Sequence, residues 1–154
     1  MSDASGPISD GTRAAALLEE ACRPAPGPPN ALRIEVVREL ARDLGRQLGT
    51  LSDLAGEDTT PDVLAEAAIC CADLANLAAC NAPDLRPDAA PRAVEAVHLA
   101  AGAVSALGPM VESKSADPDD RHAENLLRDA LSAGWRAGFA ARLAEESSAE
   151  RPSG

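Results

Sequence analysis

Hydrophobic residues recur at every third or fourth position along most of this chain, and no stretch keeps the strict alternation that marks a half-buried strand. Stretches rich in proline and glycine divide this pattern into segments, because proline removes a backbone donor and restricts the residue before it. The spacing therefore predicts an all-α fold.

Four long amphipathic helices and a short leading helix are expected. The leading helix begins at Thr12 as its N-cap and ends before the stiff connector "PAPGPPN", residues 24–30. The first long helix covers about residues 31–55, and Thr60 with Pro61 begins the second as N-cap and first-turn proline. The connectors "NAPDLRPDAAP" and "KSADPDD" precede the third and fourth helices. Short connectors predict an antiparallel bundle, and Ala and Gly on the inner faces predict close helix approach.

The chain length sets the domain organisation. With 154 residues, of which 45% are hydrophobic, the chain is of ordinary size for one compact domain. We expect a single helical-bundle domain over residues 12–147. Residues 1–11 and the tail 148–154 are polar or carry Gly and Pro, and both are expected to be disordered.

Apolar stripes at helical spacing define the expected core. Leu44, Leu74, Val104 and Leu127 lie mid-stripe on the four long helices and should pack together. The stripe of the first long helix consists of Val37, Leu40, Ala41, Leu44, Leu48 and Leu51. Charged residues fill the other side of that helix, with opposite signs three or four positions apart, as suits a solvated face: Glu35, Arg38, Glu39, Arg42 and Arg46.

The charge balance limits the classes of partner. The formal net charge is −11, which argues against nonspecific binding to nucleic acid or to anionic lipid. A partner should be neutral, basic or small. No apolar run approaches the ~20 residues of a membrane span, and "MSDASGPISDGT" lacks the features of a signal peptide. We expect a cytoplasmic protein that binds neither membranes nor nucleic acid.

The four cysteines do not have the spacing of a disulfide framework, and no C-x-x-C occurs. Cys70 and Cys71 fall on the inner stripe of the second long helix, Cys80 near its polar edge, and Cys22 in the leading helix. The thiols are interpreted as buried, small apolar groups, with metal binding or redox chemistry as the alternative.

Glu95 and His98 have the Glu-x-x-His spacing that di-iron bundles use on two of their helices. Both residues project away from the apolar stripe of the third long helix, and no complementary set of ligands is in register on the other helices. We therefore expect no metal and no cofactor.

Large side chains with the character of interface residues occur on the fourth long helix. Trp135 lies at the boundary between its apolar and polar arcs, with Arg128 nearby and Phe139 just beyond. A boundary Trp is typical of a cap over the edge of a core, but Trp and Arg are also favoured at interface hot spots. These three residues are the candidate interaction surface.

A polar row runs along the same helix. Its members fall within one narrow stripe opposite the apolar arc: His122, Asn125, Asp129, Ser132 and Arg136. The row is interpreted as a solvated face, with a ligand-binding groove for a small polar molecule as the alternative.

Two short pieces resemble one enzyme family. "PAPGPPN" resembles the Pro-x-Pro-Gly-Gly-Gly entry of the helical formimidoyltetrahydrofolate cyclodeaminase/cyclohydrolase family, and "ENLLRDALSA" resembles the Asn and Asp spacing of its late helix. The resemblance implies a dimeric helical enzyme acting on a folate, with Asn125 and Asp129 at matching positions. Pro28 and Pro29 replace the glycines, Arg128 stands where a small residue is expected, and the chain is short for that family.

Two function classes follow from these patterns. The first is a non-catalytic acidic helical bundle that acts in association with itself or with another protein, as amphipathic helices with small-residue faces suggest. The alternative is a small-molecule-binding or lyase-type helical enzyme, distantly similar to the folate family, that would use the polar row. The sequence favours the first.

Overall fold

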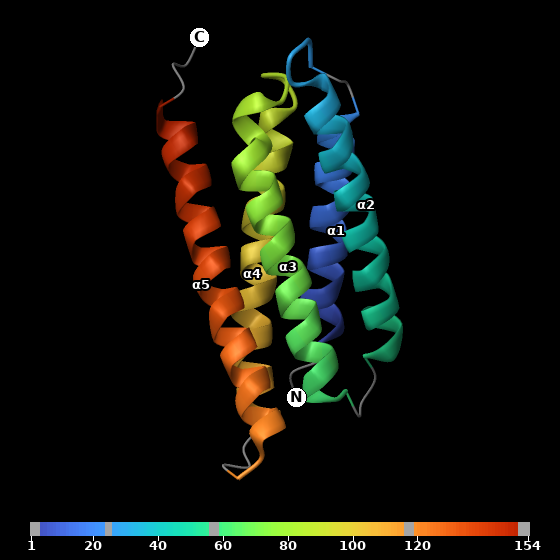
Figure 1. Ribbon diagram of the computed structural model, residues 1–154, viewed down its shortest axis with the longest axis vertical. Coiled ribbons are helices and arrows are strands. Elements are labelled where there is room, and N and C mark those ends of the chain that lie inside the picture. The colour runs from blue at the N-terminus through green and yellow to red at the C-terminus, as the bar shows by residue number, and fades with distance from the viewer. Residues whose placement is uncertain (1–3, 24–25, 56–58, 116–118, 151–154) are drawn as a thin grey trace.

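Five α-helices build the fold in the computed structural model, which describes residues 4–23, 26–55, 59–115 and 119–150 (Figure 1). No strand occurs among these described residues, and the predicted all-α class is confirmed. The elements are α1 (Ser5–Cys22), α2 (Ala31–Leu54), α3 (Pro61–Asn81), the short 3-10 helix η1 (Ala82–Asp84), α4 (Ala90–Lys114) and α5 (Arg121–Glu150).

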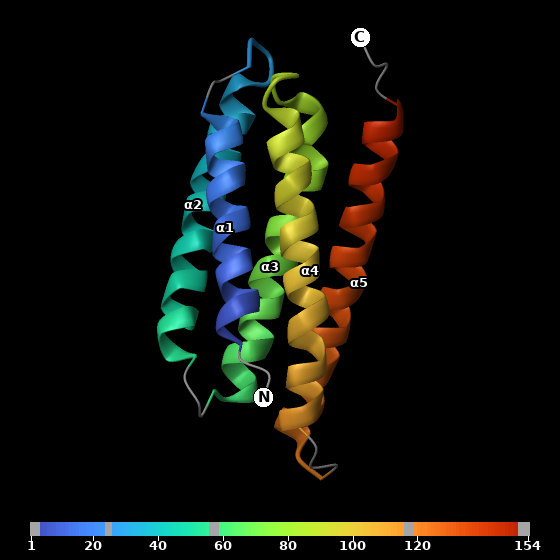
Figure 2. The same cartoon turned by 180° about the vertical axis from the view of Figure 1, so that it is seen from behind.

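The helices alternate in direction and form an antiparallel bundle (Figures 1 and 2). Helices α3 and α4 pack on each other in the middle of the bundle. Helices α1 and α2 cover one side, with α1 against α4 and α2 against α3, and α5 covers the other side against both α3 and α4. Helix α5 therefore has neighbours on one face only and keeps a long outer face.

The N-terminal helix is longer than expected. The expected disorder of residues 1–11 is wrong from Ser5 onward, because α1 begins there and buries Ile8 and Gly11. Pro7 lies in the first turn, where its missing N–H has no helical partner to lose. Thr12 is therefore not an N-cap: its hydroxyl donates to the Ile8 carbonyl, 3.1 Å away, inside the helix.

The C-terminal helix is also longer than expected. Helix α5 continues to Glu150, so the expected disorder of 148–154 is wrong for 148–150. Residues 151–154, like 1–3, lie outside the described residues.

The predicted N-cap of α3 is confirmed. The Thr60 side chain accepts a hydrogen bond from the Val63 N–H, and Pro61 lies in the first turn.

The core is made of many small residues and a few large ones. Leu74 and Leu107 are fully buried, and Val104 is almost so. Leu44 and Leu127 are only partly buried at the edge of the cluster, and Leu40, expected on the inner stripe, is 45% exposed. Helix α2 contacts neighbours on a narrower arc than its apolar stripe covers, because it lies at the outside of the bundle.

Gly11 marks a close approach between α1, α2 and α3. A Cβ at this position would lie 2.6 Å from the Cys71 Sγ and 3.2 Å from a Leu48 methyl group. Gly11→Ala should lower the free energy of unfolding by ~1–3 kcal/mol, because overpacking outweighs the ~0.5–1 kcal/mol gain in helix propensity. Gly49→Ala, where nothing lies within 4 Å of the added Cβ, is the matched control and should stabilise. Urea titrations compare the two; a stabilising Gly11→Ala would contradict this packing.

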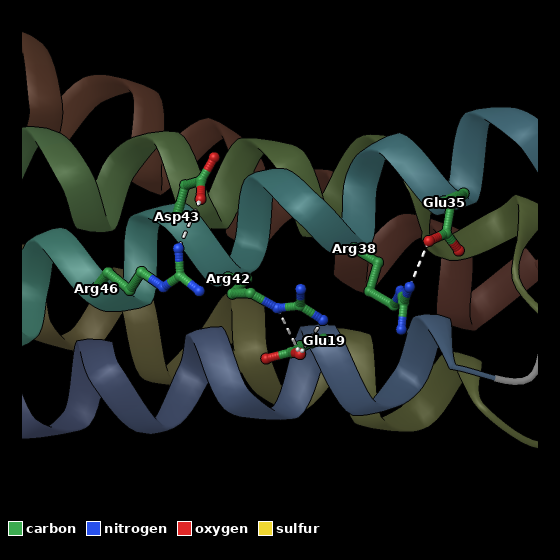
Figure 3. Close-up of polar contacts among 6 residues, drawn as sticks. All are labelled: Glu19, Glu35, Arg38, Arg42, Asp43 and Arg46. Atoms are coloured by element: carbon green, nitrogen blue, oxygen red, sulfur yellow. Dashed lines mark hydrogen bonds and ion pairs between the residues drawn. The ribbon is translucent and has the colours of Figure 1, made fainter.

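Charged residues of α2 pair both within the helix and with α1 (Figure 3). Arg38 pairs with Glu35 one turn earlier, and Arg42 reaches Glu19 on α1, with 3.1 Å between nitrogen and oxygen. Part of the charged face that the sequence predicts for α2 therefore contacts α1. Because these groups are partly exposed to water, both pairs add little to the stability of the fold.

Two central helices are long and apolar enough to cross a membrane by length and composition alone, contrary to the expectation of no such run. They are Pro61–Asp84 and Ala90–Lys114, with mean hydropathies of 1.6 and 1.4 over their most apolar stretches. In the bundle, 61% of the most apolar stretch of Pro61–Asp84 is buried. A helix packed on several sides in a soluble bundle is apolar for the same reason, so this composition is weak evidence for a membrane span.

Candidate association surface on α4 and α5

An open groove of about 610 Å³ runs between α4 and α5 on the outside of the bundle. Its lining is largely apolar or small, with few polar groups. The residues that line this α4–α5 groove are Val104, Ser105, Gly108, Pro109 and Glu112 on α4, and Leu127, Ala130, Leu131, Gly134, Trp135, Gly138 and Arg142 on α5.

Three large apolar side chains stand exposed along α5. Leu131, Trp135 and Phe139 are 66%, 75% and 60% exposed, and each follows the previous one by four residues, so they share one side of the helix. We call them the α5 ridge. The buried stripe of α5 is instead mostly alanine: Ala123, Leu126, Ala130, Ala133, Ala137, Ala140 and Ala144. Small residues bring α5 close to α3 and α4, and the large ones remain outside.

Trp135 is therefore not a cap over the edge of the core, the interpretation that its boundary position favoured. Its side chain forms part of the groove wall and is otherwise exposed to solvent. Phe139 borders a smaller hollow of about 160 Å³, which shares Arg142 with the main groove. Arg128, the third predicted interaction residue, does not line either hollow and pairs with Glu124 one turn away, at 3.7 Å.

Three glycines line the groove without serving the packing of the chain itself. A Cβ added at Gly108, Gly134 or Gly138 would meet nothing within 4 Å. Glycine inside a helix costs roughly 0.5–1 kcal/mol relative to alanine. These positions thus reduce helix stability, and the fold of the chain gains no contact in return.

The α4 side of the groove was not predicted from the sequence. Gly108 and Pro109 lie inside α4, which continues through them to Lys114. Because Pro109 has no N–H, the Ser105 carbonyl receives no helical hydrogen bond from that position. Ser105, Gly108 and Pro109 all line the groove.

The groove carries one charge of each sign. Glu112 lies near the end of α4 and Arg142 far along α5. Within the described residues neither side chain forms an ion pair, whereas Arg136 on the same helix pairs with Asp73. Both charges are therefore free to meet a partner.

The predicted polar row lies along the edge of α5 that faces α3, away from the groove. Its two ends are tied to α3: His122 Nε2 lies 2.5 Å from Asp62, and Arg136 Nη1 lies 2.6 Å from Asp73. The other three members, Asn125, Asp129 and Ser132, are exposed, and no member of the row lines either hollow. The row therefore lies along the solvent-exposed edge where α5 meets α3.

Glu95 and His98 are both exposed on α4, as their place on the helical wheel predicts. Among the described residues, no group of three or more His, Cys, Asp or Glu side chains converges as metal ligands would.

The cysteines differ sharply in their surroundings. Burial raises the pKa of the Cys22 and Cys70 thiols to about 11 and that of Cys71 to about 12, while Cys80 is exposed. The Cys70 thiol also donates to the Gln47 side-chain oxygen at 3.3 Å. Burial of Cys22, Cys70 and Cys71 confirms their interpretation as small apolar groups.

Alkylation of the native protein should follow this difference. Thiolate is the reactive form, and at pH 8 a thiol with a pKa near 11 is ionised in only about one molecule in a thousand. Iodoacetamide should label one cysteine rapidly, and Cys80→Ser should remove that reaction, as intact mass shows. Rapid labelling of a second cysteine in the folded protein would contradict the burial of the others.

No protein-family model matches this chain, and no curated protein matches it.

Proposed function

We propose that this chain is a non-catalytic, acidic helical bundle of the cytoplasm whose function is association, with itself or with another protein, through the α4–α5 groove. The observation that carries this proposal is the exposed α5 ridge beside an apolar groove. Contiguous apolar patches with a polar rim mark interaction sites, and burying each such side chain contributes roughly 1.5–3 kcal/mol.

The form of the groove favours a macromolecule over a small ligand. Small-molecule sites enclose 70–90% or more of their ligand. Here the groove is open, and Trp135 in its wall is mostly exposed. The polar row, which the alternative of a ligand-binding or lyase-type bundle requires, has its end residues held by Asp62 and Asp73.

Sedimentation equilibrium of two variants tests the proposal. Leu131→Ala removes part of the ridge, and because Leu131 is mostly exposed the fold should survive. Its association should weaken by roughly 1 kcal/mol or more, whereas Asp129→Ala should leave association unchanged. The opposite result, in which Asp129→Ala abolishes binding of a small ligand and Leu131→Ala has no effect, would favour the alternative.

A further inference from the structure

We infer that the occupant of the α4–α5 groove is a second copy of this chain, related by a two-fold axis that sets the α5 helices of the two copies antiparallel. This inference rests on the proposed function and adds the identity and orientation of the partner. Two-fold interfaces bring the same patch of both subunits together, so the patch must complement itself.

The charges of the groove have that self-complementarity. Leu127 is the first α5 residue in the groove lining and lies at the end of the groove that holds Glu112. Arg142 follows it by 15 residues, so it lies about 22 Å farther along the helix. Helix α4 ends at the same end of the bundle where α5 begins (Figure 2), and Glu112 lies in the last turn of α4. A two-fold rotation that reverses the groove places each Arg142 at the end that holds Glu112 of the other copy. A parallel arrangement would place like charges together.

The shape of the surface also fits a second copy. Each copy offers a ridge of Leu131, Trp135 and Phe139 and, beside it, a groove floored by Gly134 and Gly138. The missing Cβ atoms leave room for the helix of another molecule to approach closely, which explains glycines that make no contact within the chain.

The exposed aromatic side chains supply a substantial part of the apolar area of such a contact. Scaling typical aromatic side-chain areas by the exposed fractions of Trp135 and Phe139 gives on the order of 300 Å² from these two residues alone. A standard interface buries about 800 Å² on each partner, so the dimer must also bury surface of α4 and α5 outside the groove. The net charge of −11 on each copy opposes association, but the groove itself has balanced charge.

Charge reversal tests the orientation directly. In Glu112→Arg alone or Arg142→Glu alone, both symmetry-related contacts of the homodimer become like-charged, and self-association should weaken by about tenfold or more. In an equimolar mixture, each contact between the two variants regains one charge of each sign. Sedimentation equilibrium should show dimers in the mixture about as stable as the wild type, and circular dichroism should show unchanged helix content.

Three results would overturn the inference: a wild type that stays monomeric at millimolar concentration, single variants that associate like the wild type, or a mixture that does not regain association. Preferential pairing of Arg142→Glu with wild type would indicate the parallel arrangement and overturn the orientation. If Leu131→Ala weakens association but the single charge variants do not, the groove remains the association surface and only the antiparallel pairing is wrong.

Gly138→Ala gives an independent measurement. Nothing within the chain contacts the added methyl group, so the thermal midpoint of a dilute sample should rise slightly. Dimer association should weaken severalfold, because the methyl group occupies the space left for the other copy. A variant that is more stable and associates as well as the wild type would contradict close approach at this glycine.

Discussion

Replacing Leu74 with alanine is expected to lower the free energy of unfolding by roughly 3–5 kcal/mol, a large part of the stability of a small domain. Leu74 is fully buried on α3, the helix that packs against α2, α4 and α5. Truncation leaves a cavity that tightly packed helices cannot close, so the cost exceeds the transfer free energy of the lost methyl groups.

Leu131→Ala is the matched control, because it is the same chemical change at a side chain that is mostly exposed. It should cost roughly 0.5 kcal/mol or less. Urea denaturation at low protein concentration keeps association from adding to the measured stability. Leu44→Ala and Leu127→Ala should fall between the two, since both residues are only partly buried. Equal costs at Leu74 and Leu131 would contradict the arrangement of α3 inside and the ridge outside.

Trp135→Ala is expected to weaken association by about thirtyfold, or 2 kcal/mol, the size typical of a hot-spot residue. Trp135 is the largest exposed side chain on the ridge and lies near the middle of the groove lining. A rigid aromatic side chain supplies much contact area for little lost conformational entropy. The stability of the isolated chain should change little, because the side chain is mostly exposed.

Arg128→Ala gives a comparison on the same helix. Arg128 is exposed, forms an ion pair with Glu124 one turn away, and does not line the groove. Its loss should change association by less than about threefold, since exposed pairs contribute little. Sedimentation of both variants checks the contrast. A larger effect at Arg128 than at Trp135 would move the association surface away from the groove.

The helix pattern of the sequence predicted the all-α bundle because apolar spacing and proline positions are local properties. The pattern predicted a helix start at Thr12 because Gly6 and Pro7 precede that residue. In the structure α1 includes Gly6 and Pro7 and begins at Ser5, and Ile8 is buried. Burial of Ile8 depends on the neighbouring helices, and spacing within one segment does not contain that information.

The candidate surface was predicted in part for the same reason. Trp135 and Phe139 stood out by residue type, but their exposure depends on which stripe of α5 faces the bundle. Alanines pack closer than the large residues, so the buried stripe is the alanine one. The α4 wall, with Gly108 and Glu112, joins the site only through the packing of two helices.

Emission of Trp135 across a dilution series tests the association surface most directly, because the chain has one Trp and no Tyr. Its emission reports on the groove wall alone, and exclusion of water moves it to shorter wavelength. We expect this shift to appear as concentration rises, with the same midpoint as dimer formation in sedimentation. Emission typical of exposed Trp at every concentration, together with dimers in sedimentation, would place the contact elsewhere. The same emission with monomers throughout would contradict self-association altogether.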